Sequence, residues 1–189
     1  YLLINQKKSH FNLLRASTKF KNIKKYKDRN RQMAWGNRMD EFKMRLRKKI
    51  GVNVSRAFVK IYQIFVHFSL NSSLNNDSKR KIFKSFHFCE APGMFILGLR
   101  HYLSNCINYD LNNWDWNAQS LKAIEENKNK YNQEIFGDDY GMIKNYKDKW
   151  LFGPSNNGDI TLKENINYYS DILAQGNYSL ITFDCGLSA

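Results

Sequence analysis

Strand and helix patterns alternate through the C-terminal half of the chain, and no other feature limits its fold as strongly. The alternation predicts strands over 85–89, near 114–118, near 150–152 and over 178–183, with helices over 94–103, 120–129 and 163–174 between them. Strands and helices that alternate in this way form a parallel, doubly wound sheet. The predicted fold class is therefore α/β, in which ligands bind beyond the carboxyl ends of the strands.

Two further helices are predicted before the first strand. The earlier one runs from Asn37 to Ile50, and Gly51 is suited to end it. The later one begins at Asn53 or Ser55 and ends at Phe68. Its apolar residues recur at helical spacing and form one stripe, made of Val54, Ala57, Phe58, Ile61, Phe65 and Phe68.

The last predicted strand, 178–183, is a continuous apolar run that is followed directly by Asp184. Such runs are typical of strands that are buried on both faces of a parallel sheet. The Asp184 carboxylate would then lie at the ligand crevice. Simple exposure to solvent at a strand end is a fair alternative.

The turn Glu90-Ala91-Pro92-Gly93 follows the first strand and precedes a helix. Glycine in a tight strand-to-helix turn lets backbone N–H groups approach a ligand closely. The turn matches neither the dinucleotide fingerprint GxGxxG nor the phosphate-binding GxxxxGK[ST] loop. A turn without a ligand explains the Pro-Gly pair equally well.

Two more side chains are weak candidates when each is taken alone. Asp159, in Gly158-Asp159-Ile160-Thr161, is placed to accept hydrogen bonds from an adenine amino group or a ribose, or to form an Asx-turn before the next helix. Lys60 lies at the margin of an apolar helix stripe. A lysine there usually extends its ammonium to water, and the functional alternative is a partly desolvated amine whose lowered pKa lets it take a proton.

Composition excludes several classes of protein. Three cysteines without a CxxC pair favour a reducing compartment over a disulfide framework. Four histidines without ligand spacing argue against a metal site. No apolar run approaches the roughly 20 residues that span a bilayer, so we expect no membrane partner.

Taken together and in order, these motifs resemble the FtsJ-like (RrmJ-type) ribose 2′-O-methyltransferases. The shared pattern is Ser55-Arg56-Ala57-x-x-Lys60, a strand with Ala91-Pro92-Gly93, then Gly158-Asp159-Ile160-Thr161, and a strand that ends in Asp184. The words Cys89-Glu90-Ala91-Pro92-Gly93, Trp114-Asp115-Trp116, Phe152-Gly153-Pro154 and Gly158-Asp159-Ile160 look closer still to the Adrift-type mRNA cap methyltransferases of eukaryotes and large DNA viruses. The resemblance covers roughly residues 50–189.

The resemblance implies a Rossmann-like sheet that binds S-adenosylmethionine at its carboxyl end and methylates a ribose 2′-hydroxyl of RNA, most simply at the mRNA 5′ cap. That family uses a Lys–Asp–Lys–Glu tetrad, in which Lys60 and Asp184 match the first lysine and the aspartate. The residues that it implies for the cofactor are Glu90, Ala91, Pro92, Gly93, Trp114 and Asp159.

The chain also departs from the family pattern. Met94 replaces the second glycine of Pro-Gly-Gly, and His87 replaces an acidic residue of bacterial members. We expect residues 51–189 to be the N-terminal part of the methyltransferase domain, ending after its fourth strand and inactive alone, because the second lysine and the glutamate of the tetrad do not occur before Ala189. A ribosomal or transfer RNA methyltransferase, and a non-catalytic RNA-binding or scaffold subunit, remain alternatives.

Positive charge is concentrated in the first fifty residues. Residues 1–50 contain 16 Lys and Arg against 3 Asp and Glu, whereas residues 51–189 contain 14 of each. This split predicts a basic helical arm beside a neutral domain, and basic side chains interleaved with aromatic ones can bind RNA. A solvated surface, or contact with another capping or transcription subunit, is the alternative. The residues predicted to bind RNA are Lys24, Lys25, Tyr26, Arg29, Arg31, Trp35 and Arg56. We expect such a protein in the cytoplasm, nucleus, virion or viral factory.

Overall fold

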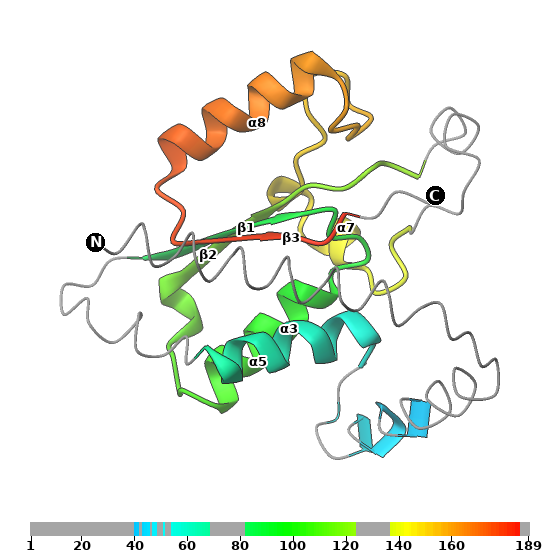
Figure 1. Cartoon of the computed structure of the whole chain (residues 1–189), viewed down its shortest axis with the longest axis vertical. Helices are drawn as coiled ribbons and strands as arrows, with labels where there is room; N and C mark the ends of the chain where they lie inside the picture. Colours follow the sequence, from blue (N-terminus) through cyan, green and yellow to red (C-terminus); the bar gives the residue numbers. More distant parts are fainter. Residues whose placement is uncertain are drawn as a thin grey trace, which may run out of the picture. The chain divides into compact units, whose positions relative to one another are not determined.

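In a computed structural model, the part of the chain that the structure describes contains three parallel strands, which form one sheet (Figure 1). β1 (Phe83–Phe88) lies in the centre, β2 (Trp114–Ala118) pairs with one of its edges, and β3 (Leu180–Phe183) pairs with the other. Both pairings are parallel, and the order β2-β1-β3 departs from chain order, as a crossover connection requires. The predicted α/β class with a parallel sheet is therefore confirmed.

The structure describes residues 40–41, 43–45, 47–48, 51, 54–68, 82–123 and 137–185. The chain divides into two units, Tyr1–Asn53 and Val54–Ala189. In the first unit, every described residue from 40 to 48 is helical, and the Gly51 amide donates to the Arg47 carbonyl at 3.0 Å. Gly51 has a φ of +69°, the left-handed conformation expected of a residue that ends a helix.

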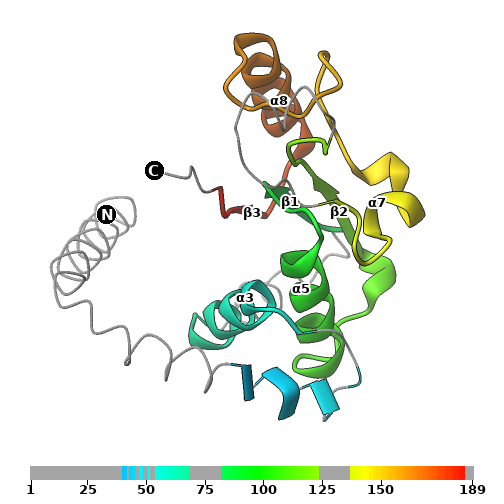
Figure 2. The same cartoon turned by 90° about the vertical axis from the view of Figure 1, so that its right-hand side faces the viewer.

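Helices cover both faces of the sheet. α3 (Arg56–His67) and α5 (Met94–Asn105) lie on one face, and α8 (Lys163–Gly176) lies on the other (Figures 1 and 2). Shorter elements lie between β2 and α8 or before β2, namely η1 (Leu111–Asn113), α7 (Met142–Asn145) and η2 (Lys147–Lys149). Among the described residues, no helix is both long and apolar enough to cross a membrane.

α3 forms as its sequence predicts. The Ser55 hydroxyl accepts a hydrogen bond from the Phe58 amide at 3.1 Å and so caps the first turn. The apolar stripe then buries Phe58, Ile61 and Phe65, and Ile61 and Phe65 join the same cluster as Leu99 of α5. Burial of each such side chain stabilises the fold by about 1.5–3 kcal/mol, which fixes the helix that carries Lys60.

The two faces of β1 pack against different helices because successive side chains point to opposite sides of a strand. Phe83 belongs to the cluster of α3 and α5. Phe86 and Phe88 pack instead with Tyr169 of α8. β1 is therefore buried on both sides, and its carboxyl end is held in a fixed position between helices.

Two predicted elements differ from the structure. Around 150–152 there is a single bridge, between Trp150 and Ala118, in place of a strand, because the chain leaves the sheet at Phe152 to enter turns. Residues 120–123 are not helical, and the rest of the predicted helix 120–129 lies outside the described residues.

β3 is not buried on both faces, contrary to the prediction. Thr182 is 8 % exposed, whereas Ile181 is 50 % and Phe183 63 % exposed. Within the described part of the chain, β3 pairs only with β1, and α8 does not cover these two side chains. The apolar run therefore correctly marks a strand but overstates its burial.

Candidate active site

Lys60 and Asp184 meet at the carboxyl end of the sheet. Lys60 comes from the first half of α3, Asp184 follows β3 directly, and the Lys60 ammonium donates to Oδ1 of Asp184 in an ion pair. The two residues are 124 positions apart in the sequence. The fold thus brings together the two side chains that the family pattern assigns to catalysis.

The Lys60 ammonium is not removed from water in this structure. Its side chain is 54 % exposed and that of Asp184 is 37 % exposed. Lys60 thus extends to water, as a lysine at the margin of an apolar stripe usually does, and the alternative of a partly desolvated amine is not what the described residues form. The ring of Phe95 lies beside the amine, with its centroid 5.8 Å away. What the structure supports is an oriented hydrogen-bond donor.

The Ala91-Pro92-Gly93 turn stands beside this pair, between β1 and α5. The Ala91–Pro92 peptide is cis, and Gly93 has a φ of +101°, a conformation that L side chains rarely adopt. A β-carbon at Gly93 would lie 2.8 Å from a side-chain atom of Met142. Glycine is thus required here both by the backbone conformation and by the neighbouring side chain.

Glu90 points back into the protein, where its side chain caps α5. Its Oε1 accepts hydrogen bonds from the amides of Phe95 at 2.7 Å and Ile96 at 3.0 Å. Burial raises the pKa of the carboxyl to about 8; the two amides act in the opposite direction, and the negative charge of Asp184 raises it further. Glu90 is predicted to contact the cofactor, but in this structure its side chain instead binds the first amides of α5 and so holds the turn in place.

Asp159 lies in a second turn at the same end of the sheet. Its carboxylate accepts hydrogen bonds from the amide of Thr161 at 2.9 Å and from the Thr161 hydroxyl at 2.7 Å. The Asx-turn that the sequence allowed is therefore formed. Asp159 is also 2 % exposed, so that in this structure its polar atoms mainly serve the turn.

Trp114 does not join the other predicted cofactor residues. It is the first residue of β2 and pairs in register with Phe83, the first residue of β1. It therefore lies at the amino end of the sheet, about 13 Å along the strand from Ala118 at a rise of about 3.3 Å per residue. Asp115, next to it, forms an ion pair with Lys149 at 2.7 Å.

His87 stands in β1 at the position of the family's acidic residue, and it is fully buried. Its Nδ1 lies 2.7 Å from the Thr182 hydroxyl and its Nε2 lies 2.9 Å from the Ser85 hydroxyl. Ser85 in turn accepts a hydrogen bond from the indole of Trp114 at 2.9 Å. Burial lowers the pKa of His87 to about 3, so the ring is neutral and links β1 to β3.

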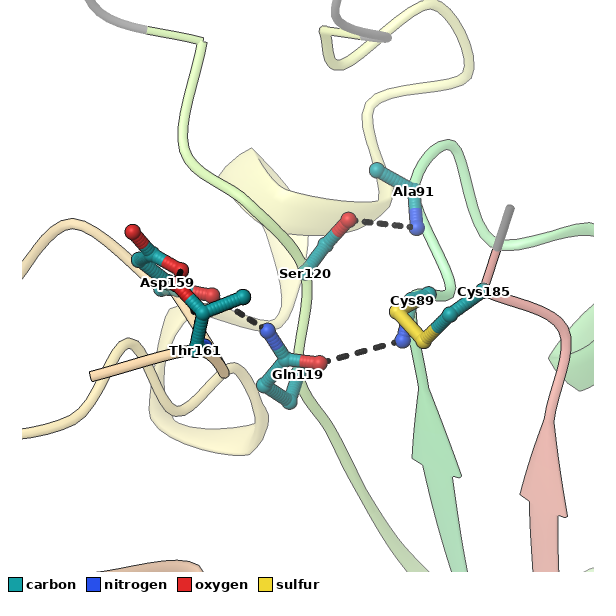
Figure 3. Close-up of a disulfide and its surroundings, with 8 residues drawn as sticks. Cys89, Ala91, Gln119, Ser120, Asp159, Thr161 and Cys185 are labelled. Atoms are coloured by element: carbon teal, nitrogen blue, oxygen red, sulfur yellow. Dashed lines mark hydrogen bonds between the residues drawn. A yellow bond between two sulfur atoms is a disulfide. The ribbon is translucent and has the colours of Figure 1, made fainter. Parts of the chain in front are cut away.

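A disulfide joins Cys89 to Cys185, contrary to the expectation of reduced cysteines (Figure 3). The two residues follow the adjacent parallel strands β1 and β3, so their Cα atoms lie 5.1 Å apart despite a sequence separation of 96. Cys106 is free and exposed. The composition could not reveal this pair, because only the strand order brings the two cysteines together.

Gln119 and Ser120 are functional candidates that sequence reasoning missed. Both are buried and follow the carboxyl end of β2. Ser120 accepts a hydrogen bond from the Ala91 amide at 3.3 Å. The Gln119 side chain accepts from the amide of Cys89, which directly precedes the first turn, and donates to the Gly158 carbonyl of the second (Figure 3). The rule that ligands bind beyond strand ends could have identified them from the end of the predicted strand.

Of the predicted RNA-binding residues, Arg56 belongs to the described part of the chain. Lys24, Lys25, Tyr26, Arg29, Arg31 and Trp35 lie outside the described residues. Arg56 is described, as the first, exposed residue of α3, and so lies one helical turn from Lys60. Over the same described residues, no three His, Cys, Asp or Glu side chains gather as a metal site would need.

Comparison with known proteins agrees with the motifs of the site. No family model and no solved structure matches the chain. Among curated proteins, cap-specific mRNA (nucleoside-2′-O-)-methyltransferase 2 of Mus musculus is 30 % identical over 172 residues, which cover 86 % of this chain and 21 % of that protein. An uncharacterized protein of Acanthamoeba polyphaga mimivirus is 38 % identical over 139 residues, 72 % of this chain and 16 % of its own length.

A viral protein named as a probable methyltransferase, from African swine fever virus, is 30 % identical over 135 residues, which make up 64 % of this chain and 28 % of that protein. The chain thus spans 16 to 28 % of the length of these relatives. The relatives, the parallel sheet and the ordered motifs agree. The chain belongs to the FtsJ-like family of ribose 2′-O-methyltransferases, in the branch of the cap-specific enzymes.

Proposed function

We propose that the protein transfers the methyl group of S-adenosylmethionine to a ribose 2′-hydroxyl of RNA at the mRNA 5′ cap. The observation that carries the proposal is the ion pair between Lys60 and Asp184. It joins two residues of the family tetrad at the end of the sheet where ligands of such folds bind.

The side chains at this end suit a cationic cofactor. S-adenosylmethionine contains a sulfonium and an ammonium group, and the partly exposed carboxylate of Asp184 lies at the carboxyl end of β3. Glu90 and Asp159 are buried beside it and hold the two turns rather than face a ligand. Asp184 is close enough to Glu90 for its charge to affect the pKa of that carboxyl. Ala91 and Pro92, both partly exposed, offer an apolar surface for the remainder of the molecule.

When bound, S-adenosylmethionine supplies an electrophilic methyl group, so the protein has to align two substrates and manage one proton. Asp184 holds the Lys60 ammonium in one orientation. A ribose hydroxyl that accepts a hydrogen bond from Nζ of Lys60 would be fixed against the methyl donor. On this proposal the charged pair positions the 2′-oxygen and stabilises negative charge as it develops there. The C–O bond would form as the C–S bond of the donor breaks to leave a neutral thioether, and the hydroxyl proton would pass to solvent, which reaches the exposed pair.

Transfer of a labelled methyl group from S-adenosylmethionine to a capped RNA oligonucleotide, with the full-length protein, tests the proposal. Lys60→Ala should lower turnover by at least about 100-fold, the range of a lost acid–base or orienting group, and should leave the cofactor Kd within about twofold. Lys163→Ala, at an exposed lysine of α8, is the matched control. Wild-type protein that binds no cofactor, or Lys60→Ala with normal turnover, would refute the proposal.

The exposure of Lys60 favours a second candidate, a methyltransferase fold that binds RNA without turnover. Cofactor binding without transfer to capped, ribosomal or transfer RNA would support it. Transfer to ribosomal or transfer RNA in preference to capped RNA would instead support a ribosomal or transfer RNA methyltransferase, the other alternative that the sequence left open.

The basic arm over residues 1–50 is proposed to hold the RNA. Its net positive charge would displace counterions from phosphates, so affinity should fall steeply with salt. Deletion of residues 1–36 should weaken RNA binding and flatten the plot of log K against log salt concentration. An unchanged slope would argue instead for contact with another protein subunit.

A further inference from the structure

Gln119 occupies a central position between the two turns of the site. It is 1 % exposed and follows β2 directly. Its backbone continues the pairing of β2 with β1, because its amide donates to the His87 carbonyl at 2.8 Å and its carbonyl accepts from the Glu90 amide at 3.0 Å. Three bonds in all attach this residue to the β1 side, since its side chain also accepts from the Cys89 amide.

The other end of the same side chain reaches the Asp159 turn. Nε2 of Gln119 donates to the Gly158 carbonyl at 2.5 Å, and Oε1 accepts from the Cys89 amide at 3.1 Å (Figure 3). One partner is a donor and the other is an acceptor, so only one orientation of the amide satisfies both. A side chain that could only accept, or only donate, would leave one buried backbone group without a partner.

The chain next to Gln119 leaves no space for adjustment. Gly158 has a φ of +72°, and a β-carbon there would lie 1.9 Å from the carbonyl oxygen of Ser120. The Gly158 turn thus packs directly on the loop after β2, while the Ser120 hydroxyl holds the Ala91 amide. Gln119 and Ser120 therefore contact both turns.

We infer that Gln119 is a positioning residue that sets the separation between the Ala91-Pro92-Gly93 turn and the Gly158-Asp159 turn, and thereby the affinity for S-adenosylmethionine. The inference depends on the proposed function, which assigns those two turns to the cofactor. Gln119 itself is buried beneath them and acts through the backbone groups that it holds.

Gln119→Glu provides a test through pH. A protonated glutamic acid can still donate to the Gly158 carbonyl and accept from the Cys89 amide, whereas a carboxylate cannot donate. Gln119 is 1 % exposed, and burial favours the protonated form of a glutamic acid there, so the ionised variant has to be tested at high pH. At pH 9 the variant should bind S-adenosylmethionine at least about tenfold more weakly than wild type does at the same pH, because repulsion between the carboxylate and the Gly158 carbonyl replaces a hydrogen bond. At pH 5 to 5.5 most of the affinity should return.

Gln175→Glu, the same change at an exposed position of α8, should bind the cofactor like wild type at every pH. Gln119→Met, which can neither donate nor accept in this way, should bind weakly at every pH. Titration calorimetry with circular dichroism would measure affinity and folding together. Wild-type affinity in Gln119→Glu at pH 9, or equal weakening at both pH values, would overturn the inference.

A measurement on the wild-type protein keeps the inference testable if the variants do not fold. Adenosine, which lacks the methionine part, would contact only the Asp159 side. Its binding should slow hydrogen exchange of the Cys89 amide, because Gln119 couples that amide to the Gly158 carbonyl. An unchanged exchange rate with bound adenosine would contradict the coupling. No binding of adenosine or S-adenosylmethionine by wild type would instead refute the proposed function.

Discussion

Replacement of Glu90 by Gln tests whether the carboxyl beneath the Ala91-Pro92-Gly93 turn is neutral in the folded protein. Glu90 is 5 % exposed, and burial raises the pKa of its carboxyl from 4.5 to about 8. The folded protein therefore holds this proton more tightly than the unfolded chain does. The resulting stabilisation is complete below pH 4.5 and is lost as the pH rises through about 8.

The window from pH 6.5 to 8 isolates this carboxyl. His87 would add little there, because burial lowers its pKa from 6.5 to about 3 and the ring is mostly neutral in both states above pH 6.5. Each pH unit between the two pKa values of Glu90 changes the unfolding free energy by about 1.4 kcal/mol, with flattening near the upper value. Wild type should thus lose about 1.5 kcal/mol across the window relative to Glu90→Gln.

Urea unfolding at three pH values in this window, followed by tryptophan fluorescence, would measure the difference. Glu90→Gln keeps an oxygen that can accept from the amides of Phe95 and Ile96, so it should fold and show no such slope. Glu164→Gln, in the exposed first turn of α8, should retain the wild-type slope. Parallel pH profiles for wild type and Glu90→Gln would show that Glu90 is a charged helix cap and refute the reasoning.

His87 changes the unfolding free energy with pH in the opposite direction to Glu90. The stabilisation from its buried neutral ring is complete above pH 6.5 and is lost as the pH falls toward about 3. His87→Asn should therefore have the flatter acid profile between pH 3 and 6 by circular dichroism, and an identical profile would count against a neutral histidine. Gly158→Ala should lower the unfolding free energy by more than about 2 kcal/mol through backbone strain and a clash, whereas Gly137→Ala, with no atom within 4 Å of its β-carbon position, should change the melting temperature little. Reduction of the disulfide between Cys89 and Cys185, 96 residues apart, should cost about 4.7 kcal/mol on the chain-entropy account; an equal urea midpoint with and without reductant would contradict it.

Local patterns predicted most of the fold that positions the site. Ser55 and the apolar stripe after it define α3, and the Pro-Gly turn separates β1 from α5. These features depend on residues that are only a few positions apart in the sequence. The exposure of Ile181 and Phe183 depends on which elements lie beside β3, and an apolar run in the sequence does not predict those neighbours.

The candidate site was predictable only in part, for a similar reason. The family pattern named Lys60 and Asp184, and the fold joins them. It also named Trp114, although the register of β2 places that residue at the opposite end of the sheet. The hydrogen bonds of Gln119 could not be foreseen, because they connect three segments whose approach is set by strand order.

The link between Cys89 and Cys185 also gives the chain a covalent topology. It closes a ring that contains α5, β2, α7, α8 and β3, whereas α3 and β1 lie on the tail before the ring. A protease cut within the ring would leave one covalently connected molecule, and a cut before Cys89 would release a separate piece. The ion pair of Lys60 with Asp184 therefore bridges the tail to the point where the ring closes, so the two candidate catalytic side chains lie on opposite sides of that junction.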